Sequence, residues 1–107
     1  MADLVEQIRR LILEGTVRIS DHGYEALLSY DITVREVVSG GALMRAIEPY
    51  PDFPKGPCVL ALQADRAGRP IHVVWGIPKG YNEPAVLVTA YRPIPMKWDP
   101  SFTRRKR

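Results

Sequence analysis

Cysteine and histidine are scarce in this chain. The sequence contains one cysteine, Cys58, and two histidines, His22 and His72. A single cysteine cannot form a disulfide within the chain and does not provide a cysteine-based zinc cage. We expect Cys58 to be a small buried strand residue, and we expect no metal and no other cofactor.

Long apolar runs are also absent. No segment approaches the roughly 20 apolar residues that a helix needs to span a bilayer. The first ten residues, MADLVEQIRR, carry acids and arginines instead of the basic and then apolar layout of a secretory signal. These absences predict a cytoplasmic protein that does not enter a membrane.

Length and composition predict one folded domain. The chain has 107 residues, of which 46% are hydrophobic and 25% are charged. These are ordinary proportions for a globular protein, and a core of this size cannot be divided between two domains. We expect a single domain over residues 1–107, with a helical part over 1–41, an antiparallel sheet over 42–92 and a basic, proline-containing tail over 93–107.

The net charge of +3 is unevenly distributed. Up to and including Asp65 the sequence has ten acidic and six basic residues, and beyond it nine basic residues accompany only Glu83 and Asp99. Basic clustering of this kind is typical of a phosphate-binding surface, although a basic tail can also serve solubility alone.

Three helices are predicted in the first part of the chain. Apolar residues recur on one face of residues 3–14, which indicates an amphipathic helix that ends at a glycine. Ser20 can cap a second helix that runs to about residue 30. Thr33 followed by Glu36 forms a capping box for a third, short helix that stops at residues 40–41.

The remaining pattern is that of strands joined by loops rich in proline and glycine. Helices followed by sequential strands predict an α+β fold, in which the helices pack on one face of a four-stranded antiparallel sheet and leave the other face free for function. We expect residues 17–19 to be only an extended link. The expected strands cover residues 43–48, 58–64, 71–77 and 85–91.

His72 is the central candidate for chemistry. Alternation along its strand places His72 on the face opposite to Trp75. If the two flanking hairpins are symmetric, His72 lies directly between Gln63 and Thr89, with Tyr91 farther along the same face. A slip of one residue in either register would remove this polar row.

A ribonuclease that uses no metal needs a base, an acid and cations that stabilise the phosphorane charge. Histidine suits proton transfer near neutral pH, and arginine offers paired donors to phosphate. We therefore assign acid–base catalysis to His72 and phosphate binding to Arg92 and Arg69, and we expect Tyr91 to be a second proton donor or a stacking surface. The alternative is that His72 is a hydrogen-bonded strand residue without a catalytic task.

His22 is a second candidate. His22 and Glu25 lie one turn apart at the start of the second predicted helix, where the helix N-terminus favours anions. The pair could form an anion site or, with Asp21, the beginning of a metal site. A plain role in opening the helix is the third possibility.

The tail combines cations with aromatic residues. Trp98 and Phe102 lie among Lys97, Arg104 and Arg105, a mixture that can stack on bases while it neutralises phosphates. Alternatively, the two aromatic residues pin the segment to the core.

Four ordered motifs resemble those of a bacterial domain-of-unknown-function family, family 4258. Its members are small stand-alone proteins, often encoded beside a zinc-finger or helix-turn-helix antitoxin, and they are grouped with the RelE-like and MqsR-like ribonuclease (BECR-type) fold. The motifs are residues 19–22 (ISDH), 70–76 (PIHVVWG), 88–93 (VTAYRP) and 97–99 (KWD).

The resemblance implies a toxin-like messenger-RNA endonuclease of a type II toxin–antitoxin pair. RNA, including ribosome-bound messenger RNA, would be its substrate, and a cognate antitoxin its partner. The implied site residues are His22, His72, Thr89 and Tyr91. A non-catalytic module that binds RNA or protein through the same fold is the alternative, and a plain scaffold with an incidental basic tail is the third hypothesis.

Overall fold

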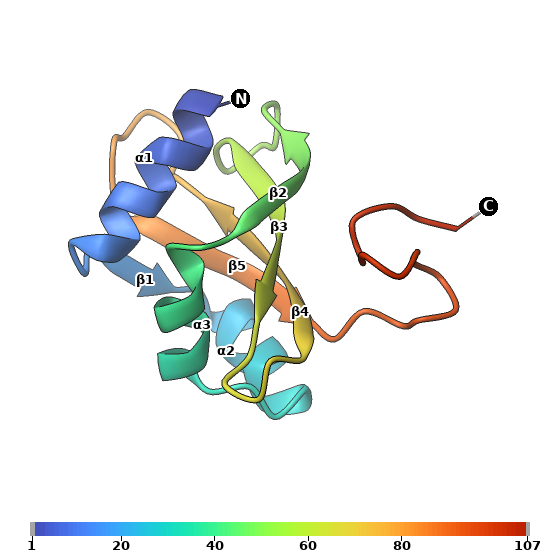
Figure 1. Cartoon of the computed structure of the whole chain (residues 1–107). Coiled ribbons are helices and arrows are strands. Elements are labelled where there is room, and N and C mark those ends of the chain that lie inside the picture. The colour runs from blue at the N-terminus through green and yellow to red at the C-terminus, as the bar shows by residue number, and fades with distance from the viewer. Residues whose placement is uncertain (1, 107) are drawn as a thin grey trace.

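The computed structural model describes residues 2–106 and contains three helices and five strands (Figure 1). Arg107, the last residue of the predicted basic tail, lies outside the described residues. No helix within 2–106 is long and apolar enough to cross a membrane. The elements are α1 (Ala2–Leu13), β1 (Val17–Ile19), α2 (Asp21–Ser29), α3 (Val34–Gly41), β2 (Arg45–Tyr50), β3 (Cys58–Ala64), β4 (Pro70–Gly76) and β5 (Ala85–Tyr91).

The α+β class is confirmed, but the predicted four-stranded antiparallel sheet is wrong. The strands form one mixed, five-stranded sheet in the order β1-β5-β4-β3-β2. Strands β2 to β5 make the predicted antiparallel meander. The residues expected as a link, 17–19, instead pair in parallel with residues 85–87 of β5. Three residues are too few to show the alternation by which a strand is recognised in a sequence.

The helix ends follow the predicted capping signals. The Ser20 side chain accepts a hydrogen bond from the backbone N–H of Gly23 at the start of α2. Thr33 and Glu36 form both halves of the capping box that begins α3. A side chain at Gly23 would meet the carbonyl oxygen of Leu87 at 2.7 Å, so glycine lets α2 approach β5.

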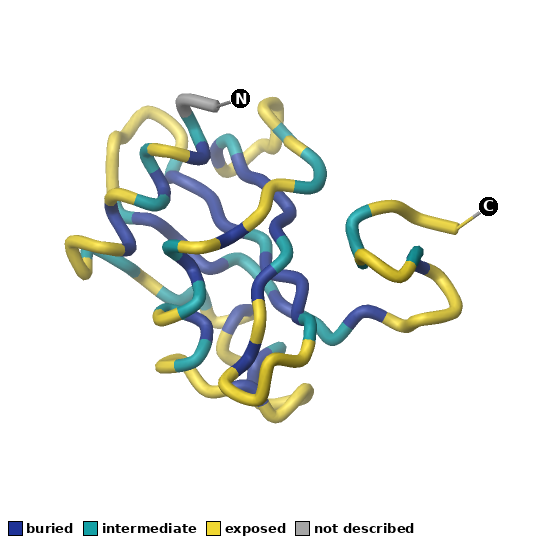
Figure 2. Tube along the Cα trace, in the orientation of Figure 1, coloured by how far each residue is buried: buried dark blue, intermediate teal, exposed yellow. Residues whose placement is uncertain are grey.

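The core lies on one face of the sheet, beneath α1 and α3. Ile8 and Ile12 of α1 and Val37 of α3 pack with Val73 and Trp75 of β4, all of them buried. Figure 2 marks the buried positions in dark blue, along the strands and at intervals along the helices. Alternation along β4 therefore directs the neighbours of these strand residues, His72 among them, to the opposite face.

The tail that follows β5 covers part of that opposite face. In Figure 1 it leaves the end of β5 and folds back on the side of the sheet away from α1 and α3. Residues 97–106 close into a hairpin-like turn, in which Trp98 bridges to Arg105 and the N–H of Lys106 donates to the carbonyl of Lys97. The sheet face predicted to be free is thus occupied in part by the chain itself.

Candidate functional site

The register across β4 differs from the prediction. His72 lies opposite Leu62 of β3 and Tyr91 of β5, not opposite Gln63 and Thr89. In the β3–β4 hairpin, Ala64 pairs with Pro70, which shifts the register by one residue from the predicted one. Between β4 and β5 a bulge shifts the register after Val74. The predicted polar row across the sheet does not exist.

Gln63 lies on the helix-covered face. Its side chain accepts a hydrogen bond from Trp75 Nε1 at 2.7 Å and donates one to the carbonyl of Val37 at 2.9 Å. These bonds satisfy a buried amide and fix β3 against α3. Thr89 lies on the same face as His72 but pairs with Val74, two residues farther along β4.

His72 and Tyr91 form a hydrogen-bonded pair on the face away from α1 and α3. The Tyr91 hydroxyl lies 3.0 Å from His72 Nδ1, and the carbonyl oxygen of Phe102 lies 2.7 Å from Nε2. A carbonyl can only accept, so Nε2 carries the ring proton and, in the neutral imidazole, Nδ1 accepts from the hydroxyl. The two ring nitrogens therefore join β5 to the tail.

Trp98 closes the site from the tail side. Its ring meets the imidazole of His72 edge to face, with centroids 4.4 Å apart. Trp98 is only 6% exposed and His72 is 0% exposed. Of the two interpretations of the tail aromatics, the structure favours a segment pinned to the sheet, with Trp98 and the backbone of Phe102 as the anchors.

The burial of this pair changes the proton affinity of both groups. Burial lowers the pKa of His72; the Phe102 carbonyl opposes this shift and the Arg105 charge adds to it. Burial raises the pKa of the Tyr91 hydroxyl, against the effect of the nearby Arg105 charge. At neutral pH the site thus holds an uncharged imidazole beside a protonated hydroxyl.

A charged group from the tail adjoins the pair. Arg105 forms an ion pair with Glu48 of β2, and its guanidinium lies 5.0 Å from the centroid of the Trp98 ring. The Tyr50 hydroxyl donates to Glu48 at 3.1 Å. We call these residues the tail-covered cluster: Glu48, Tyr50, His72, Tyr91, Trp98 and Arg105.

Sequence reasoning did not identify Glu48 and Tyr50 as members of this cluster. Their spacing of two places both side chains on the same face of a strand. The predicted strand ended at Glu48 because Pro49 follows, and a proline usually interrupts pairing. Since β2 is the last strand of the sheet, it tolerates the proline and continues to Tyr50.

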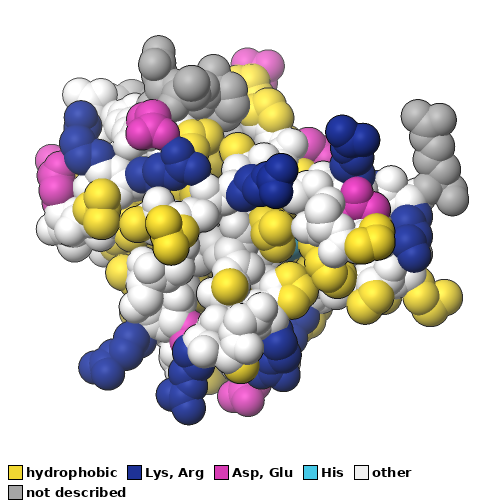
Figure 3. Space-filling view, in the orientation of Figure 1, with side chains coloured by type: hydrophobic (Ala, Val, Ile, Leu, Met, Phe, Trp, Pro, Cys, Tyr) yellow, Lys and Arg dark blue, Asp and Glu magenta, His cyan; other side chains and the backbone are white. Residues whose placement is uncertain are grey.

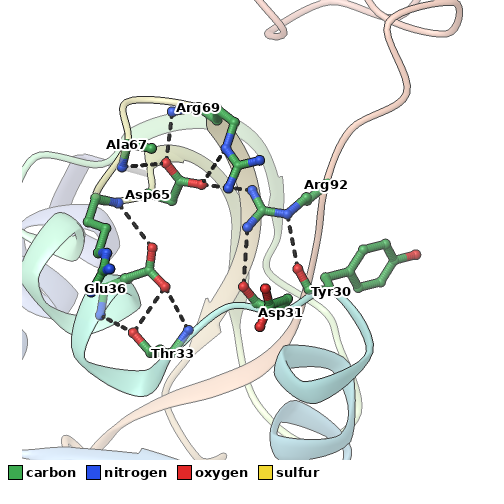
Figure 4. Close-up of polar contacts among 9 residues, drawn as sticks. Tyr30, Asp31, Thr33, Glu36, Asp65, Ala67, Arg69 and Arg92 are labelled. Carbon is green, nitrogen blue, oxygen red and sulfur yellow. Dashed lines mark hydrogen bonds and ion pairs between the residues drawn. The ribbon is translucent and has the colours of Figure 1, made fainter.

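Arg92 and Arg69, the predicted phosphate binders, both bind a carboxylate of the protein (Figure 4). Arg92 Nη1 lies 2.9 Å and Arg69 Nε 3.1 Å from Oδ2 of the buried Asp65. Arg92 also donates to the carbonyls of Tyr30 and Asp31, so it ties the β3–β4 turn to the α2–α3 link. Arg92 thus has a structural role and is largely covered, whereas most of the Arg69 side chain is exposed.

Asp65 owes its charge to these partners. Burial raises its pKa, but hydrogen bonds from the backbone N–H of Arg69, from the Arg92 guanidinium and from the N–H of Ala67 outweigh burial and lower the pKa to about 2. The carboxylate is therefore ionised throughout the physiological range.

The other candidates lie outside the tail-covered cluster or at its rim. His22 is exposed in the first turn of α2, in a different part of the molecule from His72. Lys97 and Arg104 are exposed on the tail, where cationic and apolar side chains occur side by side at the right of Figure 3. No group of three or more His, Cys, Asp or Glu residues within 2–106 is arranged to hold a metal ion.

Comparison with known protein families identifies one that matches most of the chain. Residues 19–92 match the model of a domain of unknown function, DUF4258. The chain belongs to this family. The DUF4258 segment runs from the end of β1 to Arg92 and so contains His22, His72, Thr89 and Tyr91, but neither α1 nor the tail. Searches of the curated proteins and of the solved structures found no significant match.

Proposed function

We propose that this DUF4258 protein is a metal-independent endoribonuclease of the toxin type, with a RelE-like fold, that cleaves messenger RNA. The observation that carries the proposal is the hydrogen bond between the Tyr91 hydroxyl and His72 Nδ1, covered by the Trp98 ring on which Arg105 packs. Cleavage through a ribose 2′-hydroxyl needs a base, an acid and a cation, and an uncharged imidazole, a protonated phenol and a guanidinium can fill these three roles.

The tail carbonyl holds His72 in a form that cannot act as a base at Nε2. We call the arrangement with the tail over His72 the closed form. In it, Nε2 carries the ring proton and donates a hydrogen bond to the carbonyl of Phe102. If the tail moves and a ribose 2′-hydroxyl takes the place of that carbonyl, the incoming group is a donor. The imidazole then favours the other tautomer, in which Nε2 accepts and Nδ1–H donates to the Tyr91 oxygen.

Proton transfer in this open form is balanced. His72 Nε2 takes the 2′-hydroxyl proton while the 2′-oxygen attacks phosphorus. The Tyr91 hydroxyl gives its proton to the departing 5′-oxygen and receives the Nδ1 proton of the imidazole. The products are a 2′,3′-cyclic phosphate and a free 5′-hydroxyl, and His72 is left in the tautomer that the closed form contains.

The cations of the tail have a place in this scheme. In the closed form the Arg105 guanidinium lies over the Trp98 ring that covers His72. Once the tail has moved, this guanidinium would stabilise the charge that develops on the phosphorane. Lys97 and Arg104 are exposed and can contact flanking phosphates. We further propose that a small DNA-binding antitoxin, of zinc-finger or helix-turn-helix type, is the partner that neutralises the activity.

One observation favours a second function, that of a non-catalytic module that binds RNA or protein. His72 is fully buried, and both of its ring nitrogens already have partners within the protein. A histidine used only to attach the tail would look the same. The two functions differ in whether releasing the tail produces RNA cleavage.

Cleavage assays with a loosened tail separate these functions. Trp98→Ala removes the ring that covers His72 and replaces none of the proposed reacting groups. We expect Trp98→Ala to cleave free RNA or messenger RNA on translating ribosomes faster than the unmodified protein. In that background, His72→Gln and Tyr91→Phe should each abolish cleavage, and Tyr81→Phe, which changes an exposed tyrosine, should not.

Thermal melting shows whether each variant folds. No cleavage by any folded form, on either substrate, would reject the catalytic function and leave the binding module. Cleavage that continues undiminished in the folded His72→Gln or Tyr91→Phe variant would refute the assignment of the pair.

A further inference from the structure

A cavity of about 730 Å³ lies on the same side of the sheet as the tail-covered cluster, at the other end of the strands. Cys58, Gly76 and Val86 face one another across β3, β4 and β5 and contribute to its lining. Gly76 is four residues from His72, which corresponds to about 13 Å along β4. The cavity is therefore separate from the His72–Tyr91 pair.

The wall formed by the β2–β3 loop is fixed by backbone bonds to the end of β4. Ile77 N–H donates to the carbonyl of Pro57 at 3.1 Å, and Lys79 N–H donates to the carbonyl of Lys55 at 2.9 Å. Gly56 has a φ of +132°, and a side chain there would lie 2.0 Å from the Ile77 carbonyl oxygen. This close attachment means that the cavity is formed before any ligand arrives.

The lining combines an apolar surface with cations. Val86 and Val88 of β5 provide aliphatic surface, and the Phe53 side chain, 41% exposed, adds an aromatic ring. Arg18 and Lys55 also line the cavity, and neither forms an ion pair with any residue in the described part of the chain.

Two further polar residues belong to the lining. The exposed His22 lies beside Asp21, which is the only acidic residue of the lining. The cavity thus has an excess of positive charge beside an aromatic and aliphatic surface. A ligand that matches both properties has a flat, weakly polar ring and a negative group attached to it.

We propose that this cavity binds one nucleotide, with its base against Phe53 and the β5 valines and its phosphate between Arg18 and Lys55. The volume lies within the range of roughly 300–1,000 Å³ that is usual for small-molecule sites. Aromatic stacking with cationic neutralisation of phosphate is the common way in which proteins hold single-stranded nucleic acid.

The choice of RNA as the source of that nucleotide rests on the proposed function. An RNA strand cleaved at His72 would then place a neighbouring nucleotide, not the reacting one, in the cavity. Occupancy of the cavity would thereby select the position of cleavage along the strand.

Equilibrium binding tests the site without any cleavage step. The probes are a short single-stranded RNA with 2′-deoxy substitution to prevent cleavage and, separately, the four nucleoside monophosphates. Arg18→Gln, Lys55→Gln and Phe53→Ala are the site variants. Arg35→Gln and Arg66→Gln are the matched controls, because both residues are exposed and lie outside the lining.

We expect Arg18→Gln and Lys55→Gln each to weaken binding of the RNA about tenfold, as the loss of a charged hydrogen bond does. Phe53→Ala should weaken it by a similar factor, and the controls should leave it unchanged. Monophosphates that bind and compete with the RNA would identify the free nucleotide as a ligand of the same site. Unaltered binding of both probes in all three site variants would overturn the proposal.

The two proposals fail in different ways. Loss of affinity in the cavity variants together with absence of cleavage by every form would reject the endoribonuclease and retain the nucleotide site. Cleavage that depends on His72 but not on Arg18, Lys55 or Phe53, with unchanged binding, would reject the nucleotide site alone.

Discussion

The Tyr91 hydroxyl donates its hydrogen bond to Nδ1 of His72 across the pairing of β4 with β5, and this bond is partly buried beneath the tail. The opposite ring nitrogen binds the carbonyl of Phe102, so one imidazole connects the DUF4258 segment to residues that lie outside it. Displacement of the tail would take the Phe102 carbonyl away from Nε2–H and leave the bond to Tyr91 in place. The pair can therefore take part in chemistry only when the tail has moved.

Loss of the Tyr91 hydroxyl should destabilise the fold. Tyr91→Phe leaves Nδ1 of the buried imidazole without a donor, and such a loss costs about 1–3 kcal/mol. Urea unfolding of Tyr91→Phe beside the unmodified protein measures the difference. Tyr81→Phe is the control, because that side chain is 73% exposed. Equal stabilities of the Tyr91→Phe and unmodified proteins would show that the bond does not contribute to folding.

Removal of the Trp98 ring should expose His72 to reagents. Diethyl pyrocarbonate modifies accessible neutral imidazoles, and mass spectrometry can follow both histidines of one molecule. In the protein without substitutions, we expect the reagent to modify His72 slowly and the exposed His22 fast. Trp98→Ala should accelerate the modification of His72 alone.

A second tail variant provides the control for this experiment. Met96 is also in the tail but is 83% exposed, so Met96→Ala should leave the modification of His72 slow. Rapid modification of His72 in the protein without substitutions would mean that the tail does not protect the ring in solution.

Acidification should destabilise the protein through His72. Its pKa is lowered from an ordinary value of 6.5 in the folded protein, chiefly by burial, so the unfolded chain takes up the proton first. The stability due to this group is therefore complete above pH 6.5 and decreases as the pH falls from 6.5 toward the folded-state pKa. Urea midpoints measured between pH 5 and pH 8 test the direction.

The variant His72→Gln shows whether this slope belongs to His72. Glutamine does not titrate, so the pH dependence in this range should become flatter. A slope that is unchanged by His72→Gln would assign the pH dependence to another group.

Helix positions could be predicted because their signals are local. The Ser20 cap and the Thr33–Glu36 capping box each act within one turn of the chain, and both occur as expected. The strands at Cys58–Ala64 and Ala85–Tyr91 were also predicted with their observed bounds, since apolar, strand-forming residues fill each one and turn residues flank it.

The register and the cover of the site could not be predicted, because both depend on contacts distant in sequence. The bulge after Val74 changes which residue of β5 faces His72, and no turn residue marks it. Burial of His72 depends on Trp98, which is 26 positions later in the sequence. Likewise, β1 becomes a strand only because β5 offers it a free edge.

Asp65 should account for a large part of the difference in stability between neutral and acid pH. Its pKa is lowered from 3.8 to about 2 in the folded protein, so the stability it contributes is complete above pH 3.8 and is lost as the pH falls through 2. A shift of this size corresponds to about 2 kcal/mol at neutral pH. Asp65→Asn should remove this contribution, because a neutral amide cannot balance Arg92 and Arg69.

Measurement of unfolding free energy at pH 7 and at pH 2 tests this expectation. The gap between the unmodified protein and Asp65→Asn should be about 2 kcal/mol or more at pH 7 and should narrow at pH 2, where the carboxyl group is partly protonated. Asp52→Asn, an exposed residue of the β2–β3 loop, should show little effect at either pH. If the gap does not depend on pH, the loss in Asp65→Asn comes from altered packing or hydrogen-bond geometry, and the carboxylate charge does not stabilise the turn.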